Sequence, residues 1–574
     1  MAENGTVIIK AAAVITIDAG DTRAEAIAVD VTTGRILAVG SLADCQTAAP
    51  DASIDDRGSH VLLPGFVDPH NHPFMSGVTT QAPAHWIAPY VGYPTWADVT
   101  AYFDKLQASE PAGEPLVFSG LDRMLQGAPL PNAEILDAHF PDRPVIVIDN
   151  SGHIVYFNSA IIALNGWEAG PPADPVGGSF GRTADGKCDG TANEVPAMMA
   201  AGGAVLLKVM THPLHQAAEW LALMSRNGVT MTTDHTFDPM YLKGYDALTS
   251  MADAPIRIGL YQMSTSADAG ATIETTRSEM LWKQGVKLWA DGSPWVGSAA
   301  ISFPYVDSKT VNDAEIAIGP FGDKNMNYTR AQLDTALDQY APQGWQMSFH
   351  CNGDVGLDVV LDCYEAGLAR HGLTGTDHRW RVEHCGAGRG DQFDRAHSLG
   401  VTISLSPFQF IYWGDLLDGE LFAPEIGSQW QRFADAWKAD VGLSFHNDGS
   451  VSPPIPMLNI QTAVTRTTIS GTLHGANQAI TLDQALRAST INGARQLGRD
   501  TDLGSIEVGK LADLVELSHD PFAIDPHDLV KKVKVEGTWV NGRRVDLKKF
   551  RSEVEKADPT HFHHLAGVNH HPCC

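Results

Sequence analysis

An apolar run that ends in His-x-His constrains this chain most. Residues 61–72 read Val-Leu-Leu-Pro-Gly-Phe-Val-Asp-Pro-His-Asn-His, which is typical of a buried strand with two imidazoles at its C-terminal tip. Residues two apart in a strand point to the same face, roughly 7 Å apart along the backbone, so His70 and His72 can bind one ion. Paired histidines are common and usually solvated, so a metal site also needs ligand-type residues elsewhere in the chain.

The centre of the chain, residues 64–499, alternates strand-like runs with amphipathic helical stretches, as parallel α/β proteins do. We predict a TIM-like (β/α)8 barrel, in which the loops after the strands build the active site. The eight strands are predicted at residues 65–70, 229–235, 256–263, 286–290, 347–350, 381–384, 401–406 and 442–447.

Strand-like runs also occupy both ends of the chain, and residues 1–63 and 500–550 together predict a small composite β-sandwich domain. About 160 residues separate the first two barrel strands, far more than a crossover connection needs. They predict an inserted subdomain, residues 74–225, that covers the active site; the alternative is an insertion that serves oligomer contacts only. The tail, residues 551–574, is rich in His and Cys and could bind adventitious metal or pack at a subunit interface.

Further predicted strands end in a residue able to bind or bridge a metal ion. His350 and His384 each close a strand, and Asp448 directly follows the last one. Lys287 lies in the apolar run Val-Lys-Leu-Trp, where an uncompensated ammonium is costly. It therefore needs a carboxylate partner, a lowered pKa, or conversion by CO2 to a carbamate, whose two oxygens could bridge two ions. Together with the His-x-His pair, these residues predict a metal site.

Nearly the whole chain resembles the amidohydrolase superfamily, in particular the YtcJ-like branch that includes N-substituted formamide deformylases. The segments that carry the resemblance are residues 63–72 (Leu-Pro-Gly-Phe-Val-Asp-Pro-His-Asn-His), 151–153 (Ser-Gly-His), 158–159 (Asn-Ser), 286–294 (Val-Lys-Leu-Trp-Ala-Asp-Gly-Ser-Pro), 381–385 (Arg-Val-Glu-His-Cys), 448–450 (Asp-Gly-Ser), 463–466 (Ala-Val-Thr-Arg) and 509–514 (Gly-Lys-Leu-Ala-Asp-Leu). Taken together they are highly specific.

The resemblance implies a metal-dependent hydrolase of carbon–nitrogen bonds other than peptide bonds, with one or two divalent ions, most often zinc. It implies two sets of ligands joined by a carbamylated lysine: His70, His72 and Asp448 for one ion, His350 and His384 for the other, and Lys287 between them. Asp448 is also expected to act as general acid and base, since that group must lie within hydrogen-bond reach of the attacking water.

Other residues are candidates for contacts with the substrate. His153 is predicted to donate a hydrogen bond to the oxyanion or the substrate, with a structural role as the alternative. Glu194 matches an acidic position of this branch and is an extra ligand, a substrate contact or a surface carboxylate. The weaker candidates, whose aromatic members fit a packed core as well as a pocket, are Tyr156, Arg182, Trp86 and Trp295.

Charge and composition narrow the partners and the compartment. The chain carries 68 acidic and 40 basic side chains, a formal net charge of −28, which repels nucleic acid and anionic membranes. It contains no secretory signal or long apolar run, and its seven cysteines are too few for a disulfide framework. We therefore expect a cytoplasmic enzyme that acts on a small-molecule amide, and a homo-oligomer, most simply a dimer.

Two other functions fit parts of the same pattern. A deaminase or cyclic-amide hydrolase would use the same ligands, because chemistry at a ring carbon needs the same activated water. A non-catalytic scaffold of the dihydropyrimidinase-like kind would not need its ligands. Every expected ligand position in this chain holds a competent residue, which favours an enzyme.

Overall fold

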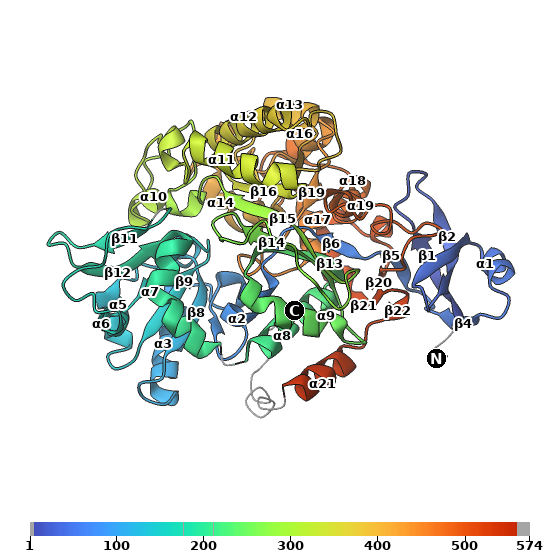
Figure 1. The fold of residues 1–574 in the computed structure, drawn as a ribbon, viewed down its shortest axis with the longest axis horizontal. Coiled ribbons are helices and arrows are strands. Elements are labelled where there is room, and N and C mark those ends of the chain that lie inside the picture. The colour runs from blue at the N-terminus through green and yellow to red at the C-terminus, as the bar shows by residue number, and fades with distance from the viewer. Residues whose placement is uncertain (1–4, 176, 211, 559–574) are drawn as a thin grey trace.

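Eight parallel strands form the centre of the described chain (Figure 1). The computed structural model describes residues 5–175, 177–210 and 212–558. The strands follow one another around the sheet in chain order: β6 (Phe66–Asp68), β13 (Val229–Phe237), β14 (Arg257–Met263), β15 (Leu281–Trp289), β16 (Gln346–Cys351), β17 (Arg381–His384), β18 (Thr402–Leu405) and β19 (Ser444–Phe445). The Asp448 amide donates to the His70 carbonyl at 3.1 Å, which brings the last strand beside the first and nearly closes the barrel. The predicted barrel is confirmed, and each predicted strand overlaps an observed one.

The barrel strands are buried on both faces, as expected of a parallel sheet covered by helices. Strand residues such as Val286, Phe349 and Val382 share one core with helix residues such as Leu357 and Phe393. The helices around the barrel include α8 (Pro213–Arg226), α9 (Leu242–Ser250), α11 (Arg330–Tyr340), α12 (Asp354–Arg370), α13 (Gly390–Ser398), α14 (Pro407–Leu417), α16 (Phe433–Lys438), α17 (Pro456–Thr465), α18 (Leu482–Ala488) and α19 (Ile491–Gln496).

Strands from both ends of the chain share one continuous sheet beside the barrel (Figure 1). Its order is β22-β21-β20-β5-β1-β2-β3, with β4 paired to β1. The two ends meet where β20 pairs antiparallel with β5, so that Leu514 lies opposite Pro64. The strands and their helix are β1 (Thr6–Ile15), β2 (Arg23–Asp30), β3 (Arg35–Gly40), α1 (Leu42–Ala48), β4 (Ser53–Asp56), β5 (Val61–Pro64), β20 (Leu514–Leu517), β21 (Val535–Val540) and β22 (Arg543–Arg544).

The segment between β6 and β13 has a six-stranded sheet of its own, ordered β11-β12-β10-β9-β8-β7. Figure 1 shows this sheet beside the barrel, on the side away from the terminal sheet. The elements of the segment are α2 (Pro73–Thr80), β7 (His85–Trp86), α3 (Trp96–Ser109), β8 (Leu116–Leu121), α4 (Arg123–Gln126), α5 (Ala133–His139), β9 (Val145–Asp149), β10 (Ile154–Phe157), α6 (Ser159–Leu164), β11 (Ser179–Arg182), β12 (Cys188–Asn193) and α7 (Glu194–Val209).

The last described helix, α21 (Leu547–Ala557), docks on α8. Its buried Phe550 and Val554 join the core that contains Trp220 of α8, and Arg551 forms a two-pronged ion pair with Glu219. The His- and Cys-rich part of the tail, from residue 559 onward, lies outside the described residues. Within the described ranges no single helix is long and apolar enough to cross a membrane, although the bent pair α7 and α8 passes that test together.

Candidate active site

A cavity of about 320 Å³ opens at the C-terminal ends of the barrel strands. Barrel residues with imidazole or carboxylate groups line one side of it, and residues of the segment between β6 and β13 line the other. The loops after barrel strands are where enzymes of this architecture build their sites. The side chains discussed below that line it are His70, His72, His153, Trp289, Trp295, His350, His384 and Asp448.

The His-x-His pair converges with Asp448, as the strand geometry predicts. Nε2 of His70 and Nε2 of His72 lie 3.4 Å and 3.2 Å from the same oxygen, Oδ1 of Asp448. Burial alone would raise the pKa of Asp448, but the hydrogen bond and charge of His72, together with the neighbouring histidine and lysine, hold it below its ordinary value. The carboxylate is therefore ionised at neutral pH and faces two imidazole nitrogens.

A buried ion pair orients His70. Nδ1 of His70 donates to Oε2 of Glu383 at 3.0 Å, and the Arg381 guanidinium donates to both oxygens of that carboxylate, from Nη2 at 2.7 Å. With its proton held on Nδ1, His70 presents the lone pair of Nε2 toward Asp448. A carboxylate behind a ligand histidine fixes the tautomer and raises the basicity of the ligand.

Lys287 is fully buried in β15, and its Nζ lies 3.5 Å from Nδ1 of His235 at the end of β13. Burial lowers the pKa of Lys287 to about 7, although Glu383 and Asp448 attract its proton. No ion pair among the described residues neutralises this amine. Of the three alternatives open from the sequence, the lowered pKa is supported by this burial, and it leaves a large neutral fraction of the amine at physiological pH.

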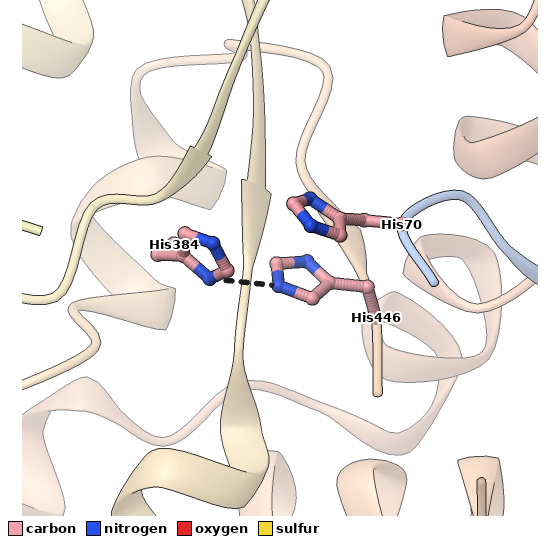
Figure 2. A group of neighbouring side chains, drawn as sticks. All are labelled: His70, His384 and His446. Carbon is pink, nitrogen blue, oxygen red and sulfur yellow. Dashed lines mark hydrogen bonds between the residues drawn. The ribbon is translucent and has the colours of Figure 1, made fainter. Parts of the chain in front are cut away.

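His350 and His384 face each other with ring centres 4.5 Å apart, and the His384 ring is 4.8 Å from that of His70. His384 is also held from behind, because its Nδ1 lies 3.0 Å from Oγ of Ser406 and 3.1 Å from Nε2 of His446. Figure 2 shows His70, His384 and His446 gathered from three strand ends. Burial lowers the pKa of His70, His350 and His384 well below the ordinary value, so the rings are neutral at pH 7.

His153 reaches the barrel from the inserted segment. Its ring lies 5.2 Å from that of His350, and its Nδ1 is 2.9 Å from Oε1 of Glu194. Glu194 adopts a left-handed backbone conformation, φ 63°, and its amide donates to the His153 carbonyl at 2.7 Å. Burial lowers the pKa of His153, but Glu194 first, then Asp291 and Asp448, raise it above its ordinary value. His153 and Glu194, separate candidates in the sequence, thus form one hydrogen-bonded unit, of which His153 lines the cavity.

Of the four weaker candidates, one lines the cavity and three do not. Trp295 lines the cavity. The other three lie elsewhere: Trp86 is buried against Trp220, Tyr156 donates to Asp149 within the insertion core, and Arg182 pairs with Asp174 on the surface.

The donor set fits a divalent cation of the zinc type. Three groups of side chains bring their ligand atoms within 4.8 Å of one another, and each contains His70. The partners of His70 are His72 and Asp448 in the first group, His384 and His446 in the second, and His235 and Glu383 in the third. Neutral imidazoles and an ionised carboxylate are the ligands that zinc uses in catalytic sites. The first group alone combines these donors with access to the cavity.

Three site residues were missed by the sequence reasoning: His235, His446 and Glu383. His235 closes the predicted second strand and His446 lies in the last one, so the same strand-end pattern could have identified them. Glu383 shares the interior face of β17 with Arg381, whereas His384 follows with a positive φ of 70° that breaks the strand alternation. A two-residue period counted from His384 would have placed Glu383 on the outer face.

Comparison with known proteins places the chain among hydrolases. A model of the amidohydrolase family matches residues 54–546. The N-substituted formamide deformylase of Arthrobacter pascens is 26% identical over 568 residues, which cover 92% of this chain and 96% of that protein. YtcJ of Bacillus subtilis is 24% identical over 523 residues, 87% of this chain and 91% of YtcJ.

One solved structure with the same fold is an uncharacterized metal-dependent hydrolase from Pyrococcus horikoshii. It superposes with a TM-score of 0.68 and 20% identity over 91% of this chain and 99% of that one. The resemblance read from the motifs is therefore confirmed over most of the sequence.

Proposed function

Because this chain belongs to the amidohydrolase family and is a hydrolase of carbon–nitrogen bonds, we propose that its substrate is an uncharged amide, with N-substituted formamides as the first class to test. One observation carries the proposal: His70, His72 and Asp448 converge on the floor of a cavity that, within the described residues, no lysine or arginine lines. An anionic substrate would find no lysine or arginine side chain to pair with there. The formamide class is supported by the similarity to the Arthrobacter pascens deformylase over nearly all of both chains.

We further propose that zinc is the ion and that Lys287 becomes carbamylated. A bound divalent cation would act as a Lewis acid and would lower the pKa of its bound water toward about 7. His70, His72 and Asp448 would hold one ion, and His350 and His384 the second. The neutral amine of Lys287, buried beside His235, is the form that adds to CO2, and the product carboxylate would lie between the two sets.

The chain's own residues then supply proton transfer and orientation. Asp448 takes the proton of the attacking water on its carboxylate and returns it to the nitrogen that leaves. Water forms the new C–O bond, the C–N bond breaks, and a formamide yields formate and an amine. His153, held through Nδ1 by Glu194, presents its other nitrogen to the cavity, where it can donate to the carbonyl oxygen.

A substrate screen tests this function. Zinc-reconstituted protein is assayed with N-alkylformamides, N-acyl amines, cyclic amides and aminated heterocycles, by detection of released amine or ammonia. We expect the formamides to be turned over fastest. Preferred turnover of a cyclic amide or release of ammonia from a ring would instead assign the alternative function, a deaminase or cyclic-amide hydrolase.

A further inference from the structure

Helix α7 has two apolar faces but only one packed core. Ala197, Ala201, Val205 and Val209 recur every four residues and are buried in the core of the inserted sheet. This face explains why the helix packs against β10 and β12. Leu206 and Met198 also reach that core, but Val195 and Met199 do not belong to it.

The second face of α7 forms a wall of the active-site cavity. Its residues follow the spacing i, i+3, i+4, i+7 and i+11, which places them along one side of a helix: Val195, Met198, Met199, Gly202 and Leu206. Leu207 is the next residue along the chain and does not line the cavity, although it is equally apolar and 56% exposed.

Other elements contribute further apolar residues to the cavity lining. Met75, Phe237, Tyr241 and Met263 come from α2, β13, a short helical turn after β13 and the end of β14. Methionine is unbranched and polarizable, so a wall rich in methionine adapts to the shape of a flexible apolar group. The proposed metal ligands of the cavity lie at the barrel strand ends.

We propose that the α7 wall is the binding subsite for an extended apolar group, alkyl or arylalkyl, on the amide nitrogen. The inference rests on the proposed function and names its substrate class. In a formamide the carbonyl carbon carries only hydrogen, so every atom beyond the amide group is attached to nitrogen. With the carbonyl at the floor beside Asp448, that substituent lies between α7 and the facing methionines.

The test measures kcat/KM for N-methyl- through N-hexylformamide, with 6-formamidohexanoate as the charged analogue of the longest one. Each added methylene that is buried should raise kcat/KM roughly fourfold until the cavity is filled. The carboxylate analogue should lose that gain, because the wall offers no cation. Equal kcat/KM for the methyl and hexyl compounds would overturn the subsite.

Two matched variants locate the effect on α7. Met199 is 46% exposed and lines the cavity, whereas Leu207 is 56% exposed and does not. Met199→Glu should lower kcat/KM for N-hexylformamide about tenfold or more while leaving N-methylformamide nearly unchanged. Leu207→Glu should match the unmodified protein with both substrates, and equal effects of the two variants would contradict the proposal.

A binding measurement distinguishes an error in the subsite from an error in the proposed function. If no formamide is hydrolysed, the proposed function is wrong, but calorimetric titration with N-hexyl- and N-methylformamide still tests the wall. The subsite is supported if the hexyl compound binds more tightly than the methyl compound and if this difference is lost in Met199→Glu but kept in Leu207→Glu. Absence of any chain-length dependence rejects it.

Discussion

Asp448 is the residue to which we assign both metal binding and proton transfer. It contacts His70 and His72 through one carboxylate oxygen, so Asp448→Asn removes an anionic ligand and the proposed base together. We predict a loss of kcat of at least about 10²–10⁴-fold, with less metal bound per chain. Steady-state kinetics and elemental analysis measure the two effects.

The control for that variant is Asp238→Asn, because Asp238 lines the same cavity but caps the turn after β13. It should keep both metal and most of the activity. Retention of more than about a tenth of kcat by Asp448→Asn would remove the proton-transfer role from this carboxylate.

Lys287 makes the stability of the metal-free protein depend on pH. Burial lowers its pKa to about 7, below the ordinary lysine value near 10.4, so between these values the unfolded chain binds more protons than the folded one. The stability of the protein therefore rises as pH increases from 7 to 10. The penalty of the buried amine is largest below pH 7.

Lys287→Met should accordingly be more stable than the unmodified protein at pH 7, by more than about 1 kcal/mol, and the gap should narrow toward pH 10. Chemical denaturation of chelated protein in CO2-free buffer measures it, with the exposed Lys208→Met as control. A gap that stays constant with pH would mean that Lys287 is not a buried neutral amine in the folded state. The same variant should lose bound zinc.

Glu194 is expected to act through His153 rather than directly. Its carboxylate is the largest of the charges that raise the pKa of His153 against the effect of burial, so Glu194→Gln should lower that pKa. The protonated donor is then lost at lower pH, and the alkaline limb of the kcat profile should move to lower pH with about tenfold lower kcat. Glu168→Gln, at an exposed carboxylate of the insertion, is the control. An unchanged pH profile with reduced metal content would make Glu194 a ligand instead.

At the scale of elements, Trp86 secures the inserted segment to the barrel helices. It is 1% exposed on β7 and packs edge-on against Trp220 of α8, with ring centres 5.7 Å apart. We predict that Trp86→Ala lowers the free energy of unfolding by about 3–5 kcal/mol without a change in substrate preference. Thermal and urea denaturation, with relative kcat/KM for two formamides, would check both halves.

The barrel strands could be predicted because each contains an apolar run, and several of these runs end in a ligand-type residue. His70, His350 and His384 were identified from their places at strand ends, and in the structure the His384 ring lies close to both of the others. Trp86 could not be distinguished from a pocket residue in this way, because its environment depends on α8, more than a hundred residues later in the chain. The sequence also could not identify the cavity wall on α7, because residues that pack in the core and residues that line the cavity are neighbours along this apolar helix.

For the whole molecule, metal content is the most direct observable. The two ligand sets that we propose at the strand ends predict that protein expressed with added zinc contains one to two ions per chain. Removal by a chelator should abolish turnover while the circular dichroism spectrum is retained, since the barrel core is made of apolar contacts rather than ligands. Full activity after exhaustive metal removal would contradict the proposed chemistry.

The shared terminal sheet can be completed only at the end of synthesis, because it contains strands from both ends of the chain. Strand β5 leads directly into β6, which carries His70 and His72, yet its partner β20 leaves the ribosome about 450 residues later. At the usual 5–20 residues per second, translation takes roughly 20–90 s to cover that distance. Until then β5 can pair only with β1, so a polypeptide terminated before β20 lacks the completed sheet on which the first ligand-bearing segment is anchored.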